Sequence, residues 1–192
     1  EAGGGIGTAY GQNTGTAELV ARHSHAGPFD RGGFGARAQW QGFESDNGRA
    51  QVRSDEVSAA VYAMEEKAFG PLLLQAGARF DIQRVNPDGV ADVQGVPART
   101  RTFRNLSGSV AALHQFARGW RVGASVARAF RAPSSDELFS QGPHLAAYTY
   151  EVGNPELDAE TGLGLDVFLR VDGRHVSAEG ALFWNEISDF AY

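Results

Sequence analysis

The sequence predicts an all-β fold, an antiparallel up-and-down β-barrel of the transmembrane kind. Three observations support this prediction. Apolar and polar residues alternate with a period of two along most of the 192 residues, as in strands with one apolar face. Several of these strands reach or exceed the roughly 9–11 residues that cross a bilayer, whereas strands of soluble sheets average about five or six. Short and long connections alternate, which gathers the turns at one end and the long loops at the other.

Eight strands follow from this alternation. The fourth is the clearest, because every second residue from Leu72 to Ile82 is apolar and faces away from Gln75, Arg79 and Gln83. The third is the least regular, and the charged run 65–67 predicts a β-bulge there. The expected strands cover residues 14–25, 33–43, 55–69, 72–84, 102–118, 120–131, 160–171 and 175–190.

The connections and the aromatic residues give the barrel a direction. Short connections are expected near 26–32, 69–71, 117–119 and 172–174, and long ones near 44–54, 84–101 and 132–158. Barrels of the bacterial outer membrane have short periplasmic turns, long external loops and an aromatic girdle at each interface. The expected girdles contain Trp120, Phe116, Phe69 and Phe34 near the short turns, and Phe130, Phe103 and Phe80 near the long loops.

The amino-acid composition limits which partners and structures the chain can have. The net charge of −6 argues against nucleic acid as a partner, since nucleic-acid binding calls for a basic surface. The chain has no cysteine and therefore no disulfide framework. It has no run of about 18 apolar residues that could form a transmembrane helix. An alternating barrel nevertheless has the average hydropathy of a soluble chain, so transmembrane strands remain the prediction.

The longest predicted loop, near 132–158, contains residues that end a strand and residues that can begin a helix. Pro133 cannot donate to a sheet and ends the strand before it. Ser134 or Ser135 can cap a short helix, with Asp136 and Glu137 at its positive end. A loop of this length between two strong strands is typical of a functional segment.

Four segments carry a family resemblance: FRAPSSDELF at 130–139, GPH at 142–144, YEVGNPELDAETG at 150–162 and ALFWNEISDF at 181–190. Together they resemble the second half of the barrel of TonB-dependent outer-membrane receptors, and LQAGARFD at 74–81 resembles a strand upstream in such barrels. The GPH followed by YE-x-GNPEL is most similar to the branch that takes up zinc and related metals.

The resemblance implies that residues 1–192 are part of a roughly 22-stranded barrel, without the plug domain, the TonB box and the remaining strands. It places the protein in the bacterial outer membrane, with membrane lipid as one partner and TonB, acting through the plug, as another. The implied function is uptake of a metal ion or metal chelate, such as zinc, a siderophore or another iron complex, with no resident cofactor.

Candidate binding residues lie in the long external loop. His144 could bind a metal or a substrate, because neutral imidazole is a common metal ligand. Glu151, Asp136 and Glu137 could complete the coordination shell with oxygen atoms, although capping and solvation are the favoured interpretation of Asp136 and Glu137.

Two further groups are weaker candidates. His23 and His25 are two residues apart on one strand and therefore share a face that could chelate a metal, although a rim position is the simpler interpretation. A second group is expected to line the lumen as a ladder of opposite charges. It consists of Arg37, Arg79, Asp81, Arg121, Asp166 and Arg170.

Two alternatives stay open at this stage. A barrel enzyme would need an activated serine or a carboxylate–histidine pair, but no catalytic motif is present and His114 and His175 have no evident partner. A soluble β-sandwich binding module would instead bury the apolar face of strand 160–171 inside the protein.

Overall fold

The computed structural model describes residues 9–46, 51–90, 92–144 and 149–190, and its main feature is one antiparallel sheet of eight long strands. Each strand pairs with the long strands before and after it in the chain, so the sheet is a meander with edges at its first and last strands and is not closed into a barrel. The strands in order are β1 (Ala9–Ala26), β2 (Phe29–Asp46), β3 (Gln51–Phe69), β4 (Leu72–Asp88), β7 (Arg101–Ala117), β8 (Trp120–Arg131), β11 (Glu160–Asp172) and β12 (Ser177–Ser188).

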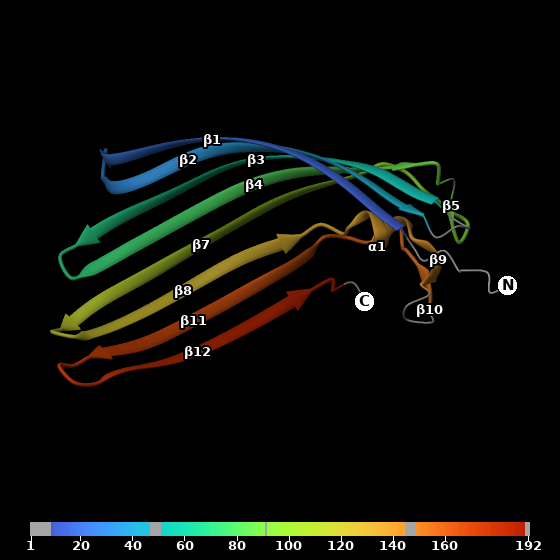
Figure 1. Cartoon of the computed structure of the whole chain (residues 1–192). Helices are drawn as coiled ribbons and strands as arrows, with labels where there is room; N and C mark the ends of the chain where they lie inside the picture. The colour runs from blue at the N-terminus through green and yellow to red at the C-terminus, as the bar shows by residue number, and fades with distance from the viewer. Residues whose placement is uncertain (1–8, 47–50, 91, 145–148, 191–192) are drawn as a thin grey trace.

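The two ends of the sheet differ, as Figure 1 shows. Tight turns join the strands at one end, the turn end, and all the short elements gather at the other, the loop end. The short elements are β5 (Asp92–Val93), β6 (Val96–Pro97), α1 (Ser135–Phe139), β9 (Gln141–His144) and β10 (Thr149–Val152). The predicted alternation of short and long connections is therefore confirmed, although β2 and β4 extend further into the loop end than expected.

The predicted bulge in β3 is wrong. The register of β3 with β2 and β4 continues without a shift through Glu65, Glu66 and Lys67, and the irregularity lies instead between Gln115 and Ala117 on β7. All three charged residues of this run have ion-pair partners on β1 or β2. Lys67 pairs with Asp30 at 2.8 Å, for example.

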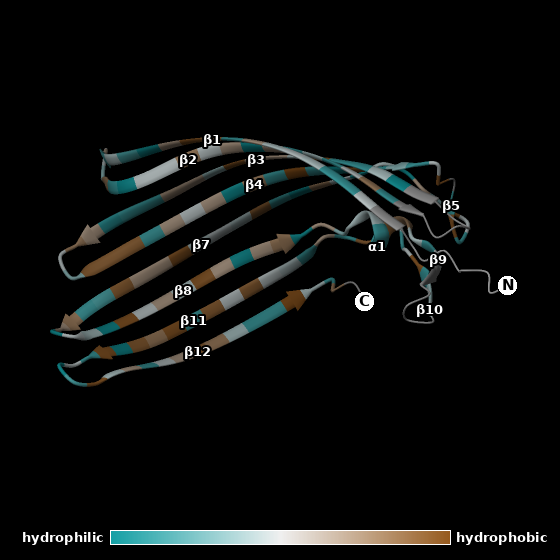
Figure 2. Cartoon of the chain, in the orientation of Figure 1, coloured by the Kyte–Doolittle hydropathy of each residue, from teal (hydrophilic) through white to brown (hydrophobic). Residues whose placement is uncertain are grey.

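One face of the sheet, the apolar face, is lined by hydrophobic residues from strand to strand. The register places Leu19, Ala36, Val61, Phe80 and Leu106 side by side across β1, β2, β3, β4 and β7. Leu19 is 78% exposed and Leu106 59%, so no described part of the chain covers them. Figure 2 shows the alternation of hydrophobic and hydrophilic residues along β4, β8 and β11. A continuous exposed apolar surface of this kind suits contact with lipid.

This arrangement contradicts the β-sandwich alternative, because no second sheet packs on the apolar face within the described ranges. Among the same residues, no helix has the length and apolar character needed to span a bilayer.

The buried core lies on the opposite face, the polar face, at the loop end. Val85 and Phe103 point to this face and pack against Leu138 and Phe139 of α1. The prediction that Phe103 belongs to a lipid-facing aromatic girdle is therefore wrong. Phe103 is three residues from Leu106 along β7, and an odd spacing in a strand places two residues on opposite faces.

Candidate functional site

The segment between β8 and β11 folds back over the polar face at the loop end and forms the candidate site. Pro133 is fully buried just after β8, and Ser134 caps α1 as predicted. The Ser134 hydroxyl accepts a hydrogen bond from the backbone N–H of Glu137, and the Glu137 carboxylate accepts one from the N–H of Ser134. This capping box fixes the start of a helix that is too short to be stable alone.

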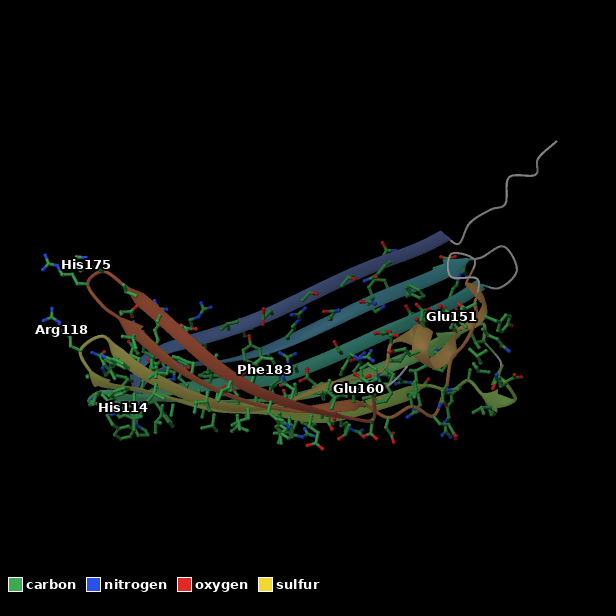
Figure 3. The ribbon with its side chains drawn as sticks, turned by 90° about the horizontal axis from the view of Figure 1, so that it is seen from below. His114, Arg118, Glu151, Glu160, His175 and Phe183 are labelled. Atoms are coloured by element: carbon green, nitrogen blue, oxygen red, sulfur yellow. The ribbon has the colours of Figure 1, made fainter. Side chains whose placement is uncertain are left out.

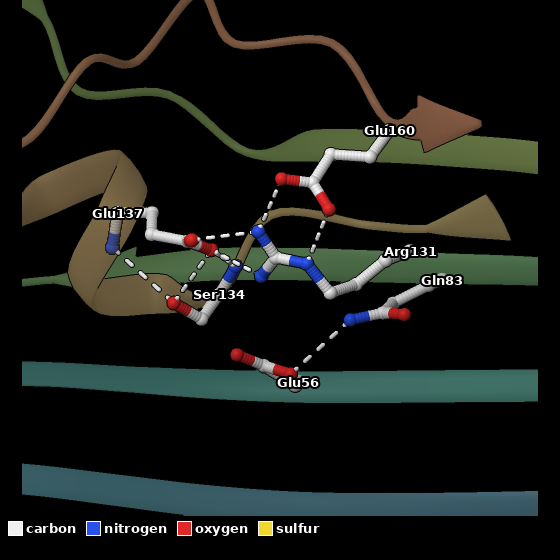
Figure 4. Close-up of polar contacts among 6 residues, drawn as sticks. All are labelled: Glu56, Gln83, Arg131, Ser134, Glu137 and Glu160. Carbon is white, nitrogen blue, oxygen red and sulfur yellow. Dashed lines mark hydrogen bonds and ion pairs between the residues drawn. The ribbon is translucent and has the colours of Figure 1, made fainter. Parts of the chain in front are cut away.

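Arg131 connects this helix to the sheet (Figure 4). Its guanidinium donates to both carboxylate oxygens of Glu137 at 2.7 and 2.8 Å, and to both oxygens of Glu160 at 2.8 and 2.7 Å. Glu160 is buried at the start of β11, directly opposite Arg131 in the register. Hydrogen bonds from Arg131 lower the pKa of Glu137 to about 2. Glu137 is thus a structural residue that is ionised at neutral pH.

The return segment is held against α1 by backbone contacts. The N–H of Gly153 donates to the carbonyl of Ser140 at 2.7 Å, and the N–H of Asn154 donates to the carbonyl of Glu137 at 2.8 Å. From β7, Arg101 donates to the carbonyls of Pro155 and Leu157. These bonds bring two stretches of the loop together as one folded unit over the sheet.

Replacing Gly153 with alanine is expected to loosen this unit by about 1–3 kcal/mol, as overpacking does. A Cβ at this position would lie 2.6 Å from the carbonyl carbon of Leu138 and 2.7 Å from the nitrogen of Phe139, and backbone atoms cannot move aside easily. Faster hydrogen exchange at the Asn154 amide would report the loosening. Gly180→Ala is the matched control, because a Cβ there meets no atom within 4 Å. Equal exchange rates in the two variants would contradict the prediction.

The loop unit carries two exposed carboxylates, those of Asp136 and Glu151, which are together called the acidic mouth. Asp136 lies in the first turn of α1, and Glu151 lies in β10 opposite Gly142 of β9. Burial raises the pKa of Asp136, and the nearby carboxylates of Glu151 and Glu137 raise it further. A cation bound here would relieve the repulsion between these carboxylates.

The predicted site residues differ in how well the structure places them. The backbone of His144 ends β9, opposite Thr149, but its side chain lies outside the described part of the structure. The described residues contain no group of three histidine, aspartate or glutamate side chains placed to hold a metal ion. Figure 3 shows Glu151 at the loop end, while His175 and Arg118 lie at the turn end. The Glu151 carboxylate raises the pKa of Asp136, and the ion pair with Arg131 holds Glu137.

The expected lumen-lining residues share the polar face, as their register requires. Arg79 pairs with Asp81 at 2.8 Å along one strand and lies 5.6 Å from the ring centre of Tyr62 on the next. Arg121 and Arg170 face each other on β8 and β11, and both contact Asp172. The charges are thus paired along strands as well as between them. Of the rest, Arg37 donates to Gln39 at 2.8 Å and Asp166 accepts from Ser125 at 3.5 Å.

The two weaker histidine candidates lie at the turn end. His23 points to the apolar face and contacts Glu65 at 3.1 Å across Gly32, which has no side chain to separate them. His25 has a φ of 60° at the end of β1, next to the turn. Both positions agree with rim residues and lie far from the acidic mouth.

Sequence reasoning missed the two arginines that hold the loop. Arg131 and Arg101 are the last residue of β8 and the first of β7, so each lies at the edge of the loop. The pairing of Arg131 with Glu160 could have been expected, because a strand that ends at 131 and one that begins at 160 face each other in an antiparallel pair. No local sequence pattern predicts the contacts of Arg101 with the carbonyls of Pro155 and Leu157, because these residues lie far away along the chain.

Comparisons with known proteins agree with this geometry. A family profile described as "TonB dependent receptor-like, beta-barrel" matches residues 3–192. Among solved structures, the copper transporter OprC superposes with a TM-score of 0.77 at 18% sequence identity, over 95% of this chain and 31% of that chain.

Two other structures are similar in the same way. A double mutant of the Serratia marcescens hemophore receptor HasR, in complex with its hemophore HasA and heme, has a TM-score of 0.68 at 17% identity over 95% of this chain and 34% of that one. The siderophore receptor PirA from Pseudomonas aeruginosa has a TM-score of 0.54 at 16% identity, over 93% and 40%. At these identities the likeness establishes the fold. The chain spans about a third of the length of the solved chains that it matches.

Proposed function

The chain belongs to the TonB-dependent receptor-like β-barrel family, and on that premise we propose that it contributes part of an outer-membrane receptor for uptake of a metal ion or metal chelate. The observation that carries the proposal is the folded loop over the polar face. It places an acidic mouth at the loop end of a sheet whose other face suits lipid. The names of the similar structures, which refer to copper, heme and a siderophore, support this class of substrate.

In the proposed mechanism the substrate binds first at the loop end. Asp136 and Glu151 attract the cation, and His144 supplies an imidazole ligand from the neighbouring strand end. The substrate then moves along the charged polar face, where Arg79, Asp81 and Arg121 offer polar contacts in place of water. Passage is driven by TonB acting on a plug within the barrel, as the family resemblance implies.

Replacing His144 with alanine in the full-length protein is expected to weaken binding by about tenfold or more for the metal that the receptor takes up. Calorimetric titration with Cu²⁺, Zn²⁺, a ferric siderophore and haem measures this change. His175→Ala is the matched control, because His175 lies in the turn between β11 and β12 at the opposite end (Figure 3). If both variants bind all four probes like the parent protein, the assignment of His144 is wrong.

The same titration has a predicted pH dependence. Since the pKa of Asp136 is raised, a proton must leave this carboxyl before it can bind a cation. Affinity for the metal should therefore fall as the pH is lowered toward the raised pKa, and the Asp136→Asn variant should lose part of that dependence.

A further inference from the structure

A glutamate of β3 lies beside the place where α1 docks on the sheet. Glu56 is half-buried on the polar face, and its partners in the register are Gln41 of β2 and Val85 of β4. Val85 belongs to the buried cluster that also contains Leu138 and Phe139 of α1. Glu56 therefore reaches the helix from a strand that is far away along the chain.

The carboxylate of Glu56 accepts two hydrogen bonds. One comes from the backbone N–H of Ser135, the first residue of α1. The other comes from the side-chain amide of Gln83 on β4, whose Nε2 lies 3.3 Å from Oε2 of Glu56 (Figure 4). The first four N–H groups of a helix have no partner within the helix. The capping box satisfies the N–H of Glu137, and Glu56 satisfies that of Ser135.

Burial makes this contact hard to replace. Ser135 is only 3% exposed, so solvent has little access to its backbone N–H. A buried N–H that loses its acceptor costs the free energy of its lost hydration. The hydroxyl of Ser135 has no hydrogen-bond partner within the described ranges. The first turn of α1 is thus attached to β3 through the backbone N–H of Ser135.

The residue after Ser135 is Asp136, one of the two carboxylates of the acidic mouth. Its charge acts on Glu56, which places the two carboxylates in the same neighbourhood. A peptide plane is rigid, so a contact that fixes the backbone of Ser135 also restricts that of Asp136. Arg131 holds the same helix through Glu137, from β8. The first turn is therefore held from two strands, and the contact next to Asp136 is the one with β3.

We propose that Glu56 is a positioning residue of the acidic mouth, and that the hydrogen bond it accepts from Ser135 sets where Asp136 lies above the polar face. The role rests on the proposed function, in which Asp136 attracts the cation. Glu56 acts through α1 and is not itself a ligand, in agreement with the lack of a three-residue metal cluster among the described residues. A mobile first turn would have to be ordered whenever a cation binds, and that ordering lowers the affinity.

The first test is hydrogen exchange of the full-length protein without any metal. In Glu56→Ala the amides of Leu138 and Asn154 should exchange about tenfold faster, as loss of a hydrogen bond to a charged acceptor implies. In Glu56→Gln they should exchange more slowly than in the alanine variant, because the amide oxygen of glutamine still accepts the N–H of Ser135. Retained protection of β3 and β4 checks that each variant is folded.

Glu66→Ala is the matched control for exchange. Glu66 also lies on the polar face of β3 and accepts a hydrogen bond from a glutamine of β4, Gln75 at 2.7 Å, but it lies at the turn end. Its replacement should leave the amides of α1 unchanged. Unchanged exchange in Glu56→Ala, or equal losses in its alanine and glutamine variants, would overturn the proposal.

The second test separates positioning of Asp136 from a general structural effect. In the titration with Cu²⁺, Zn²⁺, a ferric siderophore and haem, Glu56→Ala should weaken binding of the metal that the parent protein takes up by about tenfold, and Glu56→Gln should recover most of the affinity. In an Asp136→Asn background, Glu56→Ala should add little, because the two residues act through one contact. Additive losses would overturn the proposal.

The two tests also separate this proposal from metal uptake itself. The exchange experiment contains no metal, so it supports or overturns the hold of Glu56 on α1 whatever the titration shows. Binding of none of the four probes by the parent protein would instead contradict the uptake proposal.

Discussion

Replacing Phe139 with alanine is expected to release α1 from the polar face of the sheet. Phe139 is fully buried and packs with Val85, Phe103 and Leu138 in a buried hydrophobic cluster at the loop end. Truncating a buried phenylalanine destabilises its surroundings by about 3–5 kcal/mol. A single-turn helix has little stability of its own, so the loss should appear as local opening of the loop while the strands remain paired.

Hydrogen exchange measured on the full-length protein separates these two outcomes. The amides of Leu138 and Ser140, which bond to Ser134 and Asp136, should exchange hundreds of times faster or more, as about 3–5 kcal/mol implies. Phe116→Ala is the matched control, since this phenylalanine is 52% exposed at the turn end and packs only on the apolar face. Unchanged protection of the Leu138 amide in the Phe139 variant would show that the cluster does not hold the loop.

Replacing Arg131 with methionine is the second change with a large expected effect, about 2–4 kcal/mol. Loss of one partner of a buried ion pair removes about 3–5 kcal/mol. The lower range applies here because the Arg131 side chain is 47% exposed and partly screened by water. Methionine keeps most of the aliphatic packing, so the change isolates the two ion pairs to Glu137 and Glu160. Hydrogen exchange at the Asn154 amide, which bonds to Glu137, measures the loss.

The pH profile of loop opening gives an independent test of the same contact. The pKa of Glu137 is lowered from 4.5 to about 2, so its ion pair stabilises the docked loop fully above the ordinary carboxyl pKa. This contribution is lost as the pH falls toward about 2. In Arg131→Met the pKa of Glu137 should rise toward its ordinary value, and this acid-dependent loss should shrink to the part that comes from the hydrogen bonds of Ser134. The mobility of a spin label at the exposed Gln141 reports the opening, with Arg37→Met as a control that removes an arginine of the same face. A pH profile identical to that of the parent protein would contradict the assignment.

Alternation along the strands was sufficient to predict the sheet. Once one apolar residue such as Leu72 faces lipid, the period of two assigns every other residue of β4, and the same logic placed Arg79 and Arg121 on the polar face. The period of two also excludes Phe103 from the apolar face, because it lies three residues from Leu106 and an odd spacing puts two residues on opposite faces. Counting aromatic residues near a rim, without the parity of each strand, produced that error.

The candidate site was less accessible to sequence reasoning. Pro133 and Ser134 act locally, and their effects on β8 and α1 were predictable because a proline stop and a capping box need only neighbouring residues. The docking of α1 onto Val85 and Phe103 joins residues far apart in the chain, and no periodic pattern encodes it. The metal-binding role of His144 stays a prediction, as does that of Asp136 and Glu151.

The sequence by itself determined the strands, their two faces, and which end of the sheet carries the short turns and which the long loops. A two-residue period and alternating loop lengths are local properties of the chain. Only the tertiary structure decided where the longest loop goes. Its single helical turn is too short to be stable alone, and its position depends on the buried contacts of Leu138 and Phe139 and on the two ion pairs of Arg131. The stretch with the clearest proline and capping signals is thus held in place by residues outside it.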